Sequence, residues 1–163
     1  MEYIKLLLTN NDKIKEMSEM ASAIVREYYD PILGTAQNDY MLEKFQSEAA
    51  IRSQIEQGYQ YYFVKENHKN LGFLAFYPRG EAMYLSKFYL YKEERQKGYG
   101  RKIIDFIIRC AKAEGLSCIE LNVNRNNNTI TAYEKLGFKR IRSEKIDIGS
   151  GYFMDDHVYR LEF

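Results

Sequence analysis

The segment "MYLSKFYLYKEERQKGYGRKII", residues 83–104, decides the fold, because it reads as a strand, a loop and the start of a helix. Aromatic and branched residues dominate up to Tyr91, and the isoleucines that follow the loop recur at helical spacing. The first N–H groups of a helix have no internal partner, and Gly98 and Gly100 would let an anion approach the backbone closely. The loop therefore predicts either an anion site or a simple basic turn.

Charge favours the anion site locally. Residues 92–102 hold five Lys and Arg against two Glu, whereas the whole chain carries 24 Lys and Arg against 23 Asp and Glu. The P-loop pattern and the three-glycine dinucleotide fingerprint are both absent. Any phosphate ligand must then be held by a different kind of loop.

Length and composition indicate one globular domain over residues 1–163. The chain is 45% hydrophobic and has a formal net charge of +1, which argues against disorder and against a general nucleic-acid binder. We expect no nucleic-acid partner, no membrane span, and no secretory signal in "MEYIKLLLTNNDK". Two cysteines, Cys110 and Cys118, fit buried thiols in a reducing compartment, so we expect a cytoplasmic protein.

The rest of the chain alternates helical and strand patterns without repeats or linkers. The expected helix after Asn11 or Asp12 ends at "YYDPILGT", and the final short helix stops at Gly137. Expected strands cover 3–9, 59–66, 71–77, 81–91, 118–124, 138–147 and 155–162, and the other expected helices cover 39–56 and 99–115. This order predicts a mixed sheet with helices on its faces.

Two motifs then resemble a known family. "RQKGYG", residues 95–100, fits the [Arg/Gln]-x-x-Gly-x-[Gly/Ala] signature of the GNAT superfamily of acetyl-CoA-dependent N-acetyltransferases. "LNVNRNNNTITAYEKLGF", residues 121–138, is similar to the family's next block. The resemblance implies an α/β fold with a mixed, mostly antiparallel central sheet of about seven strands and helices on both faces.

The same resemblance implies a coenzyme A site. Backbone amides of the loop would hold the pyrophosphate, with arginines adding charge, and the strand backbone before the loop would pair with the pantetheine arm. Asn126, seven residues before Tyr133, would bind the coenzyme arm or cap the helix. The implied cofactor-binding residues are Phe88, Leu90, Arg95, Gln96, Lys97, Gly98, Tyr99, Gly100, Arg101 and Asn126.

Tyr133 is the expected catalytic residue. Amine attack on a thioester expels a thiolate, and a positioned phenol with a pKa of about 10 can give it a proton. The alternative is a tyrosine that only packs on the sheet.

The general base is left open by the sequence. Many relatives have Glu at the strand position that is Ser86 here, so a carboxylate could instead come from Glu81, Glu120 or the pair Asp155 and Asp156. Asp155 could also attract a cationic amine. Tyr29, in an aromatic stretch before the second helix, is a further candidate for acceptor binding.

The sequence therefore predicts an N-acetyltransferase that moves an acetyl group from acetyl-CoA to a primary amine by direct attack in a ternary complex. The acceptor would be a small-molecule amine such as a polyamine, or a peptide amine. No metal is expected, since neither histidine is spaced for one. Two alternatives stay open, a non-catalytic coenzyme A sensor and a nucleotide-phosphate binder, and the chain could pair as a homodimer.

Overall fold

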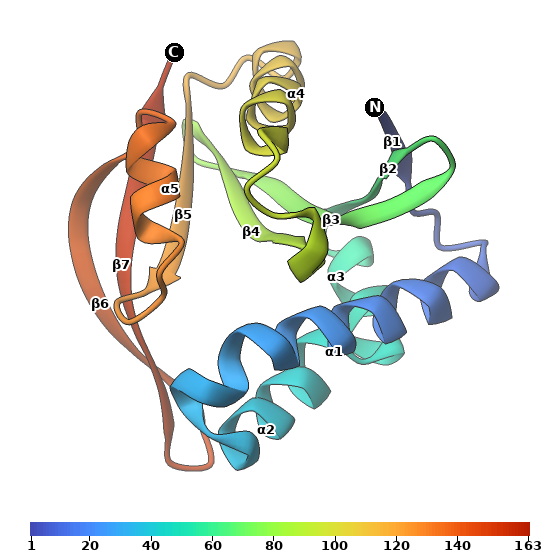
Figure 1. The fold of residues 1–163 in the computed structure, drawn as a ribbon, viewed down its shortest axis with the longest axis vertical. Helices are drawn as coiled ribbons and strands as arrows, with labels where there is room; N and C mark the ends of the chain where they lie inside the picture. The colour runs from blue at the N-terminus through green and yellow to red at the C-terminus, as the bar shows by residue number, and fades with distance from the viewer. The chain divides into compact units, whose positions relative to one another are not determined.

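A computed structural model describes all 163 residues and gives a mixed α/β fold (Figure 1). The helices are α1 Asn11–Leu33, α2 Thr35–Gln46, α3 Glu48–Glu56, the 3₁₀ helix η1 Lys92–Glu94, α4 Tyr99–Ala113 and α5 Ile130–Lys135. The strands are β1 Glu2–Lys5, β2 Gln60–Glu66, β3 Lys69–Arg79, β4 Ala82–Leu90, β5 Cys118–Asn124, β6 Lys139–Gly149 and β7 Tyr152–Glu162. They form a seven-stranded sheet in the order β1-β2-β3-β4-β5-β7-β6, which confirms the predicted mostly antiparallel sheet.

The chain divides into two compact units. The first contains Met1–Tyr77 and Lys87–Arg95, and the second contains Pro78–Ser86 and Gln96–Phe163. The division crosses β4 between Ser86 and Lys87 and crosses the basic loop between Arg95 and Gln96.

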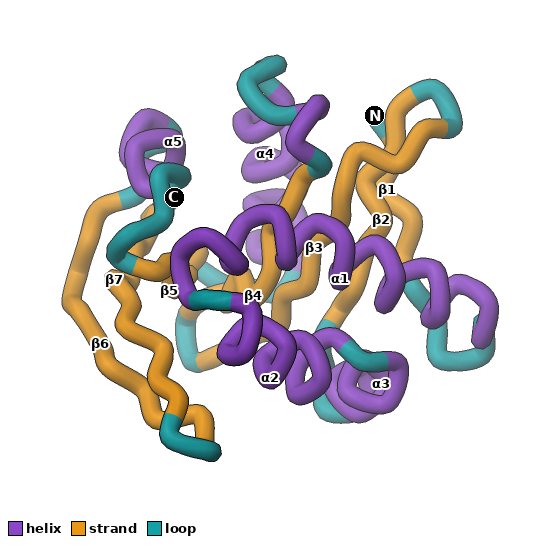
Figure 2. Tube along the Cα trace, turned by 60° about the horizontal axis from the view of Figure 1, so that its bottom comes forward, coloured by secondary structure: helices purple, strands orange, loops and turns teal.

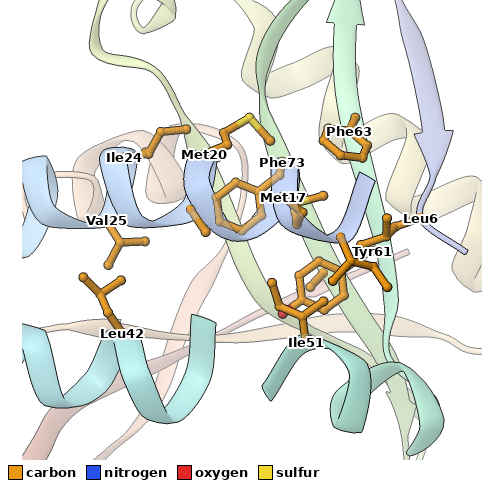
Figure 3. Packing of buried hydrophobic residues seen from close by; sticks show 13 residues of the cluster. Leu6, Met17, Met20, Ile24, Val25, Leu42, Ile51, Tyr61, Phe63 and Phe73 are labelled. Carbon is orange, nitrogen blue, oxygen red and sulfur yellow. The ribbon is translucent and has the colours of Figure 1, made fainter. Parts of the chain in front are cut away.

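The first unit is built on an aromatic and aliphatic core. Helices α1, α2 and α3 pack on one another, as Figure 2 shows, and α1 buries one apolar stripe that includes Ile14, Met17 and Ile24. This stripe meets side chains of β2 and β3, among them Tyr61 and Phe73 (Figure 3). Hydrophobic burial of this stripe fixes α1 as part of the core.

Two predicted boundaries in this unit are wrong, although α1 ends at Leu33, inside "YYDPILGT", as predicted. The helix runs through Pro31 because a proline in the last turn removes only the bond to the Glu27 carbonyl. Its cap is Asn10, whose side chain accepts from the Lys13 amide, rather than Asn11 or Asp12. The first strand covers four residues instead of seven.

The helix expected over 39–56 is two helices. Ser47 adopts an extended conformation, with φ −66° and ψ 160°, and its Oγ accepts a hydrogen bond from the Ala50 amide at 3.1 Å. That N-cap ends α2 and starts α3. The serine was readable as a cap, but the apolar periodicity runs on across it.

A lysine lies in the core of the first unit. Lys87 of β4 is 6% exposed, and its Nζ donates to the Phe45 carbonyl at 2.8 Å, to Gln54 Oε1 at 2.7 Å and to the hydroxyl of Tyr61. Burial lowers the pKa of Lys87 well below its usual value and raises that of Tyr61. The three acceptors match the three donors of an ammonium, but none carries a charge.

The second unit is built on antiparallel pairing of β5 with β7 and of β7 with β6. The only parallel pairing joins β4 to β5 over three positions and ends at Tyr84 opposite Glu120. Because strand side chains alternate, β5 places Ile119, Leu121 and Val123 on one face and Glu120, Asn122 and Asn124 on the other. The second face is polar.

Candidate functional site

The basic loop enters α4 with a strained, exposed backbone. Gln96 and Gly98 both have positive φ, at 61° and 81°, and Gln96, Lys97 and Gly98 are exposed. Gly98 is the N-cap of α4 and supplies no side chain to cap it. Left-handed residues in such a turn direct successive N–H groups to one side, and the helix dipole adds partial positive charge, so this loop can bind an anion.

Cations flank this helix start unequally. Arg101 and Lys102 of the first turn are exposed. Arg95 instead has partners in the first unit: its guanidinium stacks on the Tyr28 ring at 3.7 Å, lies 3.6 Å from Glu27 Oε1 and donates from Nε to the Leu90 carbonyl at 3.2 Å. Its charge is therefore shared with α1.

The end of β4, where Phe88 and Leu90 lie, requires a glycine on β3. A Cβ built on Gly72 would lie 2.0 Å from the Tyr89 carbonyl oxygen and 2.8 Å from the Leu90 Cα. No side chain fits there. Gly72 thus sets the backbone path of the β4 segment for which the sequence predicts pantetheine pairing.

Tyr133 is placed by the sequence "LGF" that ends α5. The Gly137 amide donates to the Glu134 carbonyl and the Phe138 amide to the Tyr133 carbonyl, both at 3.1 Å, with Gly137 at φ 101°. This is a Schellman motif, and it packs the Phe138 ring edge-on against Tyr133 at 5.6 Å. The half-buried tyrosine is fixed in orientation by its own helix end.

The asparagines at the end of β5 and in the turn before α5 have different roles. Asn127 is buried, and its Oδ1 accepts from the amide and the hydroxyl of Thr129 at 2.9 and 2.8 Å. Asn124 Oδ1 accepts from the Asn126 amide at 2.9 Å. Asn126 is exposed, so the turn is held by its neighbours and its side chain stays available for a ligand.

The adjacent acids Asp155 and Asp156 have different surroundings. Asp155 is partly buried, with its side chain 44% exposed, and its Oδ1 lies 2.8 Å from Arg125 Nη2. Asp156 is 3% exposed and accepts a hydrogen bond from Asn122 Nδ2 at 3.4 Å. Burial, opposed by the Asn122 hydrogen bond and reinforced by the Glu144 and Asp155 charges, raises the pKa of Asp156 to about 6.

Two remaining candidates lie on different units. Tyr29 belongs to an aromatic group in the first unit, where its hydroxyl lies 3.4 Å from that of Tyr89 and the two rings meet edge to face. Ser86 is half-buried on β4 in the second unit. No three His, Cys, Asp or Glu side chains gather as metal ligands, and no helix is long and apolar enough to span a bilayer.

A family model described as an acetyltransferase (GNAT) domain matches residues 26–153. The chain belongs to the GNAT acetyltransferase family. It is therefore an acyltransferase that uses a coenzyme A thioester, and its matched region includes segments of both compact units.

Solved structures of GNAT proteins share the fold of this acetyltransferase at low identity. The PaiA N-acetyltransferase of Thermoplasma acidophilum, in complex with coenzyme A, has a TM-score of 0.75 and 18% identity, with all of both chains covered. A GCN5-related N-acetyltransferase of Rhodopseudomonas palustris has a TM-score of 0.80 and 12% identity, covering 99% of this chain and 95% of that one. The ribosomal-protein-alanine N-acetyltransferase of Brucella melitensis has a TM-score of 0.67 and 13% identity, with all of both chains covered. No curated protein matches this sequence.

Sequence reasoning about this GNAT acetyltransferase missed two buried groups. Lys87 lies between Ser86 and Phe88 on the strand and belongs to no motif. Only its apolar neighbours could have indicated that it is buried. Asp156 was paired with Asp155 as an equal candidate. Strand alternation alone would have placed the two on opposite faces.

Proposed function

We propose that residues 1–163 act as one N-acetyltransferase domain that moves an acetyl group from acetyl-CoA to a primary amine by direct attack in a ternary complex. The observation that carries this proposal is the uncapped start of α4 after two residues of positive φ, Gln96 and Gly98. A helix start of this kind favours a pyrophosphate over a neutral ligand. Membership of the GNAT family makes coenzyme A the matching donor.

In this proposal the amides of residues 96–101 bind the pyrophosphate, and Gly98 and Gly100 leave room for its oxygens. Arg101 and Lys97 supply most of the added positive charge, because Arg95 is already paired with Tyr28 and Glu27. The backbone of Phe88 and Leu90 pairs with the pantetheine arm. Asn126 adds a side-chain contact to the same arm.

Tyr133 protonates the departing sulfur. As the amine nitrogen bonds to the carbonyl carbon, the carbon–sulfur bond breaks and negative charge develops on sulfur. A phenol with a pKa of about 10 can donate to a thiolate whose conjugate acid has a pKa of about 8.5 in the transition state. The Schellman motif that fixes Tyr133 limits the reorganisation that this transfer requires.

The acceptor is a small-molecule or peptide amine, and Tyr29 and Asp155 are candidates for its binding. We place the reaction in the cytoplasm, in keeping with Cys110 and Cys118 being thiols rather than a disulfide. The one observation that favours a non-catalytic coenzyme A sensor instead is Ser86, which puts no carboxylate on β4 where many GNAT enzymes carry a base.

Calorimetric titration of acetyl-CoA and of ATP, followed by thiol release across a panel of amines, tests this function. We expect binding of acetyl-CoA but not ATP, and a several-fold loss of affinity in Arg101→Ala. Arg109→Ala, an exposed arginine two turns further along α4, is the matched control and should bind normally. Absence of acetyl-CoA binding contradicts the proposal, and binding without turnover on any amine favours the sensor.

Tyr133→Phe tests the proton donor. We expect kcat to fall about 10- to 1,000-fold with coenzyme affinity nearly unchanged, because only the hydroxyl is removed. Tyr3→Phe, which removes a hydroxyl on β1, should leave both values unchanged. An unaltered kcat in Tyr133→Phe would exclude Tyr133 from the mechanism.

A further inference from the structure

An alkylammonium acceptor has a pKa of about 10 and must lose a proton before its nitrogen can attack. The proposed function therefore needs a group that is ionised near neutral pH and free to receive that proton. Ser86 cannot do this. The carboxylates that the sequence offers are Glu81, Glu120, Asp155 and Asp156.

Three of these four carboxylates are held by arginines. Glu120 lies 3.6 Å from a guanidinium nitrogen of Arg160 and 3.9 Å from one of Arg142. Glu81 also faces Arg160, at 3.6 Å, and Asp155 pairs with Arg125 at 2.8 Å. Each of these three carboxylates therefore already has a guanidinium partner.

Asp156 forms no ion pair. Its Oδ2 accepts a hydrogen bond from the neutral amide of Asn122 at 3.4 Å. Glu144 and Asp155 both raise its pKa, and Arg125 is the one cation that lowers it. Because burial adds to the acidic neighbours, the pKa of about 6 lets this carboxyl be ionised at neutral pH and still take up a proton.

A hydrogen-bonded relay holds the carboxyl in position. Asn122 Nδ2 is shared between Asp156 and Glu144 Oε2, which lies 3.3 Å away, and Asn122 Oδ1 accepts from the Tyr84 hydroxyl at 2.8 Å. Tyr84 is at the last position where β4 pairs with β5. The relay therefore links β4, β5, β6 and β7.

Asp156 also lies at the functional end of β5. In the register it is opposite Asn124, the last residue of that strand. The chain leads directly from there into the turn with Asn126 and the helix with Tyr133. Glu120, which is the carboxylate on the same face, lies four residues back toward the start of the strand.

We propose that Asp156 is the general base of the transfer, an assignment that rests on the proposed function. Its carboxylate takes one proton from the ammonium, and the freed nitrogen then bonds to the thioester carbonyl carbon. The carbon–sulfur bond breaks as Tyr133 protonates sulfur, and the second nitrogen proton leaves to restore the phenol through solvent. Asp156 releases its proton to solvent, so one proton is produced in each turnover.

Asp156→Asn removes the base and keeps the side chain's size. With the amine that gives the highest turnover, we expect wild-type kcat/KM to rise through about pH 6 and then stay level. In Asp156→Asn only the free amine reacts, so kcat/KM should rise about tenfold per pH unit up to pH 9 and be about 100-fold lower at pH 7. Acetyl-CoA affinity should change less than about twofold.

Asp105→Asn, which removes an exposed carboxylate on α4, is the matched control and should keep the level profile. A purely structural role would lower kcat/KM equally at every pH, and a level profile in Asp156→Asn overturns the assignment while the proposed function stands. An equal change of slope in Asp105→Asn also overturns it. Absence of wild-type turnover on every amine overturns the proposed function and the base together.

Discussion

Among its Asp, Glu, Lys and Arg side chains, each compact unit of the molecule buries one that has no ion-pair partner. In the first unit Lys87 meets three neutral acceptors, and in the second Asp156 meets one neutral amide. The number of partners separates the two. Lys87 donates three hydrogen bonds, whereas Asp156 accepts one, from Asn122.

Buried ionisable groups with many hydrogen bonds and those with few are suited to different roles in a protein. A fully hydrogen-bonded lysine fixes the carbonyl of Phe45, near the end of α2, to α3 and the sheet. A carboxyl with one weak partner costs stability when it is ionised, and a proton relieves that cost. We infer that Lys87 stabilises the fold and that Asp156 takes part in the reaction. Two stability measurements test this difference.

The larger effect is expected from Lys87→Ala. This change leaves a cavity where three methylenes and the amino group were and removes three hydrogen bonds, so we expect the free energy of unfolding to fall by about 3–4 kcal/mol. Denaturant unfolding measures it. Because burial lowers the pKa of Lys87, the unfolded wild-type chain binds more protons than the folded one below the ordinary lysine pKa. The free energy of unfolding of wild type should therefore rise with pH, so the stability difference between wild type and Lys87→Ala should grow from pH 7 to pH 9.5.

Lys92→Ala provides the control for this lysine, since Lys92 is exposed on η1 and should change stability by less than about 0.5 kcal/mol. A Lys87→Ala protein as stable as this control would mean that the buried network has no net structural value.

The smaller effect has the opposite sign. Asp156→Asn should raise the free energy of unfolding by about 1–3 kcal/mol at pH 7.5, because the folded-state pKa of about 6 lies above the ordinary value of 3.8. The native state then binds more protons than the unfolded state between those values. Wild type therefore loses stability as pH rises through that window, and the advantage of the variant should vanish near pH 4.

Thermal unfolding of Asp156→Asn and Asp155→Asn at pH 4 and pH 7.5 measures this gain. Asp155→Asn, which breaks an exposed ion pair, should lose up to about 1 kcal/mol at pH 7.5. A less stable Asp156→Asn protein at pH 7.5 would show that the carboxylate is structural, like Lys87.

Much of this molecule could be predicted from local pattern. The strand over 118–124 and the start of α4 at Tyr99 agree with the sequence prediction, since alternation and glycine placement are properties of short segments. The Gly137 stop of α5 is equally local. The boundary error at Ser47 came from the same short-range rules, because the effect of one capping hydroxyl is decided by the packing around it.

The candidate site also contains some residues that local sequence pattern predicts and others that it does not. The loop, Asn126 and Tyr133 follow from two contiguous motifs. Arg95 does not, because its partners Tyr28 and Glu27 lie more than sixty residues earlier. The pairing of Asp156 with Asn122 and Glu144 depends on strand register, which no local pattern specifies.

By itself the sequence determined the GNAT family, the loop that we propose binds phosphate and the candidate proton donor, because each is encoded in a stretch whose backbone geometry its own glycines and asparagines set. Only the tertiary structure decided which charges are neutralised and which are not. Arg95 is paired, Lys87 is saturated and Asp156 is left with a single amide. These outcomes depend on burial and on distances between strands, so they exist only once the sheet has formed.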